Sequence, residues 1–250
     1  MSKSSTAEES LIHYQGAPAL NYWVQGHNPV RQPGGFHYLP CQNSMTDHQA
    51  TRKQLRRELR ARRRALTPQQ QKRASRGLCR NLLASRELRD ARSIALYWPN
   101  DGEIDPRPLQ AAVERMNKRC YLPVLHPILG NRLWFLRLDR NTPMRRNRFG
   151  IPEPSPSRTA SKPAWALDVV LMPLVGFTAE GDRLGMGGGF YDRTFAFLSH
   201  PDRHRPKLIG LAHEGQRVDT MPTASWDIPM DAIVTDQGHY PVSDRGACLS

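Results

Sequence analysis

The chain has 250 residues, enough for one large domain with a hydrophobic core or for one domain with appendages. Its formal net charge is +13, from 36 Lys and Arg against 23 Asp and Glu, and this excess suits polyanionic partners such as nucleic acid or nucleotide phosphates. No apolar run is long enough to cross a bilayer and no C-x-x-C pair occurs, so we expect a cytoplasmic protein without structural zinc or disulfides.

Residues 1–50 lack the periodic patterns of the rest of the chain. Gly, Pro, Gln, Asn and aromatic residues are scattered through them, and the whole chain is only 38% hydrophobic, with a mean hydropathy of −0.62. We therefore expect residues 1–50 to be an irregular, disordered extension and residues 51–250 to form a single α/β domain. Because Met45 lies just before the first patterned helix, we hypothesise that the natural chain starts there; the intact mass of natively expressed protein tests this.

Two helices are predicted after the extension. The first is Arg-rich and covers residues 52–64. Its apolar side carries Leu55, Leu59 and Leu66. The second begins with a capping box, in which Thr67 is the N-cap, Pro68 takes the first helical position and Gln70 closes the box. The residues that form its buried face stand four apart: Ala74, Leu78 and Leu82.

Strands and helices alternate through the remainder of the chain. Strands are expected over residues 93–98, 121–125, 133–138, 168–173, 207–212 and 232–235. Helices are expected after Asp105-Pro106 and at about residues 191–198. This alternation predicts a three-layer, Rossmann-like α/β domain with a mainly parallel sheet, and ligands bind such sheets beyond the carboxyl ends of the strands.

The strongest chemical signal is a glycine-rich stretch that follows the apolar run 169–177. It reads, from residue 180 to residue 193, Glu-Gly-Asp-Arg-Leu-Gly-Met-Gly-Gly-Gly-Phe-Tyr-Asp-Arg. Glycines at this density bring backbone N–H groups close to a ligand, and a following helix favours phosphate. Arg183 and Arg193 add positive charge, and Asp192 is a candidate metal ligand. A glycine hairpin whose aromatics cover a core is the alternative, although the flanking charges favour a ligand.

The glycine-rich stretch matches neither familiar nucleotide signature. A dinucleotide fingerprint needs a glycine where Phe190 stands, and no Gly-Lys-Ser/Thr of a P-loop occurs. The residues alone therefore predict a phosphate-binding loop, with or without Mg²⁺.

With these pieces in order, residues 52–236 resemble the 5-formyltetrahydrofolate cyclo-ligase family. Five landmarks stand in the family's order: Arg52-Lys53-Gln54-Leu55-Arg56, Glu103-Ile104-Asp105, Phe149-Gly150-Ile151-Pro152-Glu153-Pro154, the loop 183–193, and Trp226-Asp227. Each landmark is weak alone, but their shared order on an α/β background is specific.

The resemblance implies an ATP- and Mg²⁺-dependent ring closure of 5-formyltetrahydrofolate to 5,10-methenyltetrahydrofolate, with release of ADP and phosphate. Phosphorylation of the formyl oxygen makes the carbon electrophilic and the oxygen a leaving group, so that N10 can attack. Such a transfer needs alignment and charge neutralisation more than covalent help from the protein. The substrate, with or without a polyglutamate tail, is the expected partner of a monomeric enzyme.

The resemblance also assigns roles to individual positions. The ATP-binding positions are Arg52, Lys53, Arg56, Arg183, Leu184, Gly185, Met186, Gly187, Gly188, Gly189, Phe190 and Tyr191. Trp98 and Glu103 fall on the folate contacts, with Glu103 near the formyl group. The catalytic set is Glu103, Arg183 and Tyr191. Asp192 and Asp227 fall on the magnesium positions, and we expect them to converge on one ion.

Departures from the family pattern concern the nucleotide contacts. Met186 and Gly188 stand where relatives often carry basic residues, and Arg52 stands where Lys is usual. These changes bear on ATP affinity more than on the reaction.

Alternative interpretations remain at the level of single residues and of the whole chain. Trp98 can be a sheet-end aromatic, Glu103 a surface acid and Asp227 a turn residue. The Arg-rich helices can belong to an RNA-binding or regulatory protein, although no aromatics are interleaved for base stacking and we do not expect nucleic acid. A folate-binding paralogue without catalysis is the third interpretation.

Overall fold

The computed structural model describes residues 44–156, 159–199, 205–224 and 226–242, which belong to one compact unit. The expected disorder of residues 1–43 lies outside the described residues. The first helix, α1, spans Ser44–Arg64. It begins eight positions before the expected start at residue 52, so residues 44–50 are helical rather than irregular.

Three further helices follow α1 in the first part of the unit. The helices α2 and α3 span Pro68–Ala84 and Arg86–Asp90, and α4 spans Pro108–Arg115. The capping box of α2 is confirmed, because the Gln70 N–H donates to Thr67 Oγ1 and the Thr67 N–H donates to Gln70 Oε1. The predicted apolar face of α2 is buried as well.

The central sheet has eight strands in the order β12-β11-β10-β7-β1-β2-β3-β6. Its strands are β1 Ser93–Ala95, β2 Arg119–Leu125, β3 Leu133–Leu138, β6 Ser161–Lys162, β7 Val169–Pro173, β10 Lys207–Leu211, β11 Ala232–Val234 and β12 His239–Pro241. The five central strands, from β11 to β2, are parallel, and the edge strands β12, β3 and β6 are antiparallel. The mainly parallel sheet is therefore confirmed.

Two small hairpins and short helical turns complete the described elements. They are β4 Met144–Arg146 with β5 Pro152–Pro154, β8 Gly176–Phe177 with β9 Arg183–Leu184, α5 Phe190–Thr194, and the 3₁₀ turns Ala164–Ala166, Ala196–Ser199 and Glu214–Gln216. The β8–β9 hairpin delivers the chain into the glycine loop, which is thereby anchored at its start.

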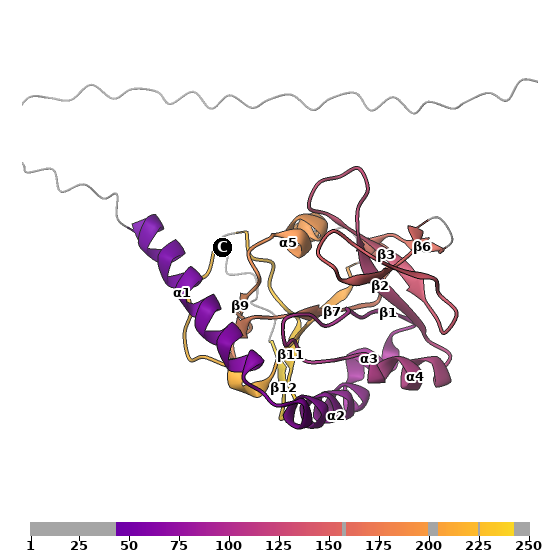
Figure 1. Cartoon of the computed structure of the whole chain (residues 1–250), viewed down its shortest axis with the longest axis horizontal. Coiled ribbons are helices and arrows are strands. Elements are labelled where there is room, and N and C mark those ends of the chain that lie inside the picture. Colours follow the sequence, from indigo (N-terminus) through magenta and orange to yellow (C-terminus); the bar gives the residue numbers. More distant parts are fainter. Residues whose placement is uncertain (1–43, 157–158, 200–204, 225, 243–250) are drawn as a thin grey trace, which may run out of the picture. The chain divides into compact units, whose positions relative to one another are not determined.

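The sheet packs against helical segments on both faces, which gives three layers with a hydrophobic cluster on each face of the sheet. Figure 1 shows α2, α3 and α4 along one face of the strands and α5 on the other. Leu78, Leu82 and Leu109 join the first cluster, and Phe195 joins the second. A smaller cluster packs Leu59 of α1 against Val175 and Leu184, which brings α1 to the glycine loop.

The helix expected at residues 191–198 is much shorter in the structure. After Thr194 the chain changes to a 3₁₀ turn, and Phe195 enters the core. The Thr194 hydroxyl donates to the Phe190 carbonyl and accepts the N–H of Leu133 on β3. This tertiary bond, which no local pattern reveals, ties the end of α5 to the sheet.

Candidate active site

A cleft of about 1390 Å³ opens between the first half of α1, the glycine loop and residues 223–224 and 226–229. The predicted site residues that line it are Arg52, Lys53, Arg56, Arg183, Gly185, Gly187, Gly189, Asp192 and Asp227. Among the described lining residues, Arg193 and Arg205 raise the basic side chains to six, against two acidic ones. The volume exceeds the roughly 300–1,000 Å³ of a typical small-molecule site, so an anionic nucleotide has room and charge complementarity here.

Helix α1 delivers two arginines to this cleft because they stand one turn apart. Arg52 grips Asp227 with both terminal nitrogens, at 2.8 Å and 3.2 Å, and also donates to the Pro222 carbonyl. Arg56 Nε donates to the Gly185 carbonyl at 2.8 Å. The basic helix is thus attached to both other walls of the cleft.

The backbone of the glycine loop explains two of its glycines. Gly187 and Gly189 have φ angles of 91° and 64°, in the left-handed region that side chains other than glycine rarely adopt. A Cβ at position 187 would lie 3.7 Å from the Arg56 guanidinium, so space is adequate and the backbone angle is the stricter requirement. The loop conformation therefore depends on glycine at these positions.

The helix after the loop is shorter than expected. The helix α5 has only five residues, and its N-cap Gly189 offers no side-chain cap. The dipole of the longer helix expected at residues 191–198 is therefore absent from the described residues. The loop N–H groups and the surrounding arginines remain the candidate phosphate-binding elements.

The predicted metal ligands lie on the same side of the sheet. Asp192 and Asp227 both line the cleft, and the N–H of Ile228 lies 3.4 Å from Asp192 Oδ1. Arg183 also donates to that oxygen, whereas Oδ2 of Asp192 accepts no hydrogen bond from the described residues. Both oxygens of Asp227 are taken by Arg52, and one also accepts the Ala224 N–H.

The donor set fits Mg²⁺ in kind, because this ion takes one or two carboxylates and completes its shell with water and phosphate oxygens. Within the described ranges no group of three or more His, Cys, Asp or Glu side chains gathers in a way that could hold a metal. Asp192, with its unclaimed oxygen, is the better placed of the two carboxylates.

Glu103 lies in the loop after β1, and its side chain is only 10% exposed. The Asn100 N–H donates to Glu103 Oε2 at 3.1 Å, and Arg63 Nη2 lies 3.7 Å from Oε1. Burial raises the pKa of Glu103 to about 7, against the opposing effect of the Arg63 charge. A carboxyl group with this pKa exchanges its proton readily near neutral pH.

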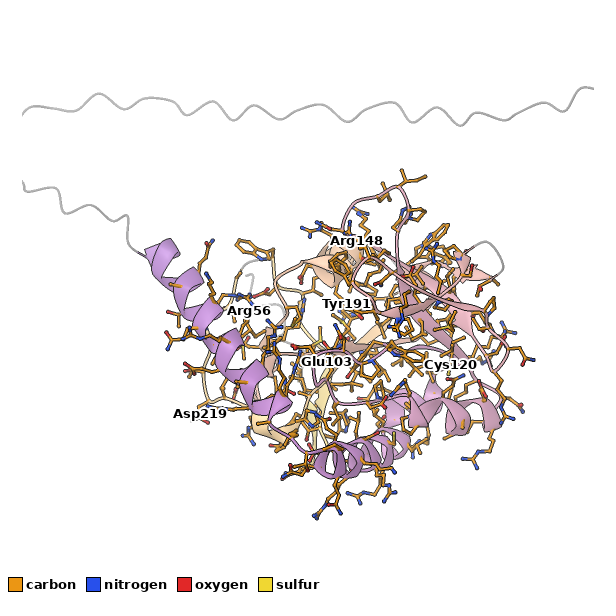
Figure 2. The ribbon with its side chains drawn as sticks, viewed as in Figure 1. Arg56, Glu103, Cys120, Arg148, Tyr191 and Asp219 are labelled. Carbon is orange, nitrogen blue, oxygen red and sulfur yellow. The ribbon has the colours of Figure 1, made fainter. Side chains whose placement is uncertain are left out.

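Tyr191 connects Glu103 electrostatically with the glycine loop. Burial raises the pKa of the Tyr191 hydroxyl, the charge of Glu103 raises it further and that of Arg183 opposes the change. Figure 2 shows Glu103 and Tyr191 in the interior, with Arg56 on α1 to one side. Of the three predicted catalytic residues, Tyr191 is therefore within electrostatic reach of both Glu103 and Arg183.

Trp98 and Glu103 do not line this cleft. Trp98 packs against the core beneath α2–α4, and the guanidinium of Arg107 lies 4.7 Å from its ring centroid. The folate role predicted for Trp98 gains no support from this arrangement. Phe149 is a better aromatic neighbour of the loop, because its exposed ring lies edge-on to Phe190 with 6.1 Å between centroids.

Arg63 and Asp101 contact Glu103 or its loop and were not predicted as site residues. A signal for Arg63 existed, because it stands four residues after Leu59 on the apolar side of α1. The Asp101-Gly102 pair marks a turn, but no local signal predicts that Asp101 binds Arg63. No helix in the described parts of the chain has the length and apolarity that a membrane span requires.

Comparisons with known proteins agree with these features. The model of the 5-formyltetrahydrofolate cyclo-ligase family matches residues 48–236. A 5-formyltetrahydrofolate cyclo-ligase of Haemophilus influenzae is 43% identical over 183 residues, covering 73% of this chain and 96% of that relative. The Escherichia coli K12 protein of the same name is 40% identical over 177 residues, covering 71% and 96%. The solved 5,10-methenyltetrahydrofolate synthetase of Aquifex aeolicus has a TM-score of 0.67 at 30% identity, covering 80% of this chain and 96% of that one.

Proposed function

The chain belongs to the 5-formyltetrahydrofolate cyclo-ligase family, and from this premise we propose that it converts 5-formyltetrahydrofolate to 5,10-methenyltetrahydrofolate while ATP becomes ADP and phosphate. The observation that carries the proposal is the convergence of α1, the glycine loop and residues 226–229 on one basic cleft. Tyr191 belongs to that loop, and the charge of Glu103 acts on its hydroxyl.

The reaction balances as two successive displacements. The formyl oxygen takes the γ-phosphoryl group as the bond to ADP breaks, which leaves the formyl carbon electrophilic. N10 then forms a bond to this carbon and loses its proton, and the C–O bond breaks to release phosphate and the methenyl cation. No oxidant or reductant is required.

The basic side chains of the cleft serve the first displacement. Arg56, Lys53 and Arg183 neutralise the triphosphate, and the loop N–H groups hold it in line with the formyl oxygen. When bound, Mg²⁺ would be held by Asp192 and Asp227 and would neutralise further phosphate charge. Arg52 would have to share Asp227 with the ion, since it holds both oxygens of that carboxylate.

Glu103 serves the second displacement. Its pKa of about 7 suits a group that accepts the N10 proton as ring closure proceeds. The Tyr191 hydroxyl keeps its proton because its pKa is raised, and it can donate a hydrogen bond to the departing phosphate.

Purified full-length protein tests the proposal when mixed with 5-formyltetrahydrofolate, with and without ATP and Mg²⁺. We expect methenyl absorbance and ADP to appear together, in equal amounts, and only when folate and ATP are both present. Rapid ATP hydrolysis without folate would contradict the coupling. The Glu103→Gln variant, prepared identically, controls for contaminating activity.

One observation keeps RNA binding as a second candidate. A groove of about 840 Å³ between α2 and the turn 214–216 is lined by four exposed arginines without partners among the described residues: Arg62, Arg73, Arg76 and Arg80. An RNA complex held by them would weaken by about one log unit per log of salt for each phosphate contacted. Affinity for single-stranded RNA, measured between low and physiological salt, separates this candidate from the enzyme.

A further inference from the structure

Arg63 is the one arginine of α1 whose side chain is wholly buried, at 0% exposure, within the described part of the helix. Arginine is almost never fully buried unless its charge and donors are matched. Its nearest neighbours of the same type, Arg62 and Arg64, are exposed. The surroundings of Arg63 must therefore match its charge and its hydrogen-bond donors, and its contacts indicate what it does.

The guanidinium of Arg63 joins three segments of the site. Nε donates to the Asp101 carbonyl at 2.8 Å, and Nη2 donates to Asp101 Oδ2 at 2.9 Å. Nη1 donates to the carbonyl of Leu174, just after β7, at 3.2 Å. Nη2 also lies 3.7 Å from Met186 Sδ in the glycine loop and 3.7 Å from Glu103 Oε1. One side chain thus touches the Glu103 loop, the sheet end and the nucleotide loop.

Asp101 makes a tight turn immediately before Glu103. Asp101 and Gly102 have φ angles of 52° and 76°, and Asp is among the few residues that tolerate the left-handed region. Arg60, Arg63 and Arg64 all donate to the Asp101 carboxylate. Burial alone would raise the pKa of Asp101, but these hydrogen bonds outweigh it and hold the pKa well below its usual value.

The carbonyl of Gly102 is held from two further elements. Gln71 on α2 donates to it from Nε2 at 3.2 Å, and His213 Nε2 lies 3.2 Å away. The same Gln71 nitrogen also donates to the Arg63 carbonyl. The turn is therefore fixed by α1, α2 and the residue that precedes the 214–216 turn.

We propose that Arg63 is a positioning residue, which fixes the Asp101–Glu103 turn so that the Glu103 carboxylate faces the reacting groups in one orientation and in its charged form. The proposal rests on the proposed function, in which Glu103 accepts a proton. Arg63 acts through Glu103 and touches no substrate.

The distance between Arg63 and Glu103 supports this role. At 3.7 Å the pair is longer than a hydrogen bond, so Arg63 attracts the carboxylate without occupying it. Among the described residues Oε1 accepts no hydrogen bond and stays available to the substrate. The charged or titratable groups that act on Glu103 or hold its loop are Arg63, Asp101, Arg60, Arg64, Tyr97, Tyr191 and His213. Of the two cations in direct electrostatic contact, Arg63 has the larger effect.

Helix α1 also links this turn to the nucleotide cleft. Arg52 and Arg63 are eleven residues apart, which is about 16 Å along a straight helix. The middle of α1 binds Asp227 and Gly185 through Arg52 and Arg56, and its C-terminal end binds the Glu103 turn through Arg63. One helix therefore carries both the arginines that line the cleft and the arginine that holds the Glu103 turn.

The test compares Arg63→Met and Arg63→Lys with Arg62→Met, a matched exposed arginine without a described partner. We expect Arg63→Met to fold, because Asp101 keeps Arg60 and Arg64 and Gln216 Nε2 still donates to the Leu174 carbonyl. The acidic limb of the kcat/KM profile should move up by about one pH unit, since a charge at this distance is lost. The KM for ATP should stay within about twofold of the value for the unsubstituted enzyme, because Arg63 takes no part in the proposed ATP binding.

Arg63→Lys keeps the charge but loses the planar fork. We expect it to restore most of the pH profile while kcat stays about tenfold below that of the unsubstituted enzyme. Arg62→Met should change neither property.

A readout without turnover separates this proposal from the proposed function. Carboxyl ¹³C NMR, with the Glu103 signal assigned from Glu103→Gln, reports the Glu103 titration in substrate-free protein. A folded Arg63→Met with unchanged Glu103 titration overturns the proposal, whether or not the protein is a cyclo-ligase. If Arg63→Met does not fold, an Arg63→Lys variant with unaltered kcat and titration overturns it equally. A shifted titration in a protein without cyclo-ligase activity would leave the positioning intact and reject the proposed function.

Discussion

Replacing Glu103 by Gln should make the protein more stable above neutral pH and nearly inactive. The side chain is 10% exposed, and burial raises the pKa of Glu103 from 4.5 to about 7 in the folded state. Between these values the folded protein binds more protons than the unfolded chain, so stability falls as pH rises. The stabilisation that protonated Glu103 gives the folded state is fully present below the unfolded pKa of 4.5 and is lost once the pH exceeds about 7.

The size of the effect follows from the shift in pKa. The rise of the Glu103 pKa from 4.5 to about 7 corresponds to about 3.4 kcal/mol, and relaxation around the buried group reduces this to about 1–3 kcal/mol. Gln has nearly the same shape and carries no charge. Glu103→Gln should therefore gain this stability at pH 8 and gain almost none at pH 4.

Urea unfolding of both proteins without ligands, at several values of pH, measures the difference directly. Other titrating groups are common to the two proteins and cancel. Glu58→Gln, an exposed glutamate of α1, is the matched control and should show no pH-dependent difference. In parallel, kcat/KM for the cyclo-ligase reaction should fall by roughly two to four orders of magnitude in Glu103→Gln. A variant that is less stable at pH 8, or whose stability difference is independent of pH, would refute the reasoning.

Three further predictions concern the cleft and its support. Gly187→Ala should raise the KM for ATP about tenfold because its φ of 91° is strained for alanine, whereas Gly215→Ala, with open space around the Cβ, should not. Asp192→Asn should raise the Mg²⁺ concentration for half-maximal activity about tenfold in a metal titration, with the distant Asp219→Asn as control. Leu59→Ala should lower the free energy of unfolding by about 2–5 kcal/mol in urea, because this wholly buried side chain packs α1 onto the glycine loop.

Local signals in the sequence predicted local structure well. The capping box at Thr67 and Gln70 formed as expected because all its partners lie within four residues. The parallel core followed from short apolar runs separated by helices, since that order leaves few other ways to bury both faces of a sheet. The start of α1 was misjudged because residues 44–50 carry no apolar period.

Signals for the site were less complete, because the site depends on contacts between distant segments. The glycine loop, Asp192 and Asp227 were identified from their motifs, and the structure places them around one cleft. The predicted length of α5 was wrong, because the helix ends at Thr194, whose side chain accepts a hydrogen bond from Leu133, 61 residues away. The folate role of Trp98 was assigned through the family resemblance and stays a prediction, and its neighbours in the structure are Arg107 and the core.

The arginines of α1 show why a basic helix alone does not identify a partner. The same pattern predicts an RNA-binding face and a helix that serves its own domain. The structure adds the intramolecular acceptors of two of these arginines, which lie 38 residues away at Asp101 and 175 residues away at Asp227. Arg52, Arg60 and Arg63 form ion pairs with these carboxylates within the protein, whereas Arg62 on the same helix is exposed. These ion pairs attach α1 to the cleft beside the glycine loop at Asp227 and to the turn that carries Glu103 at Asp101.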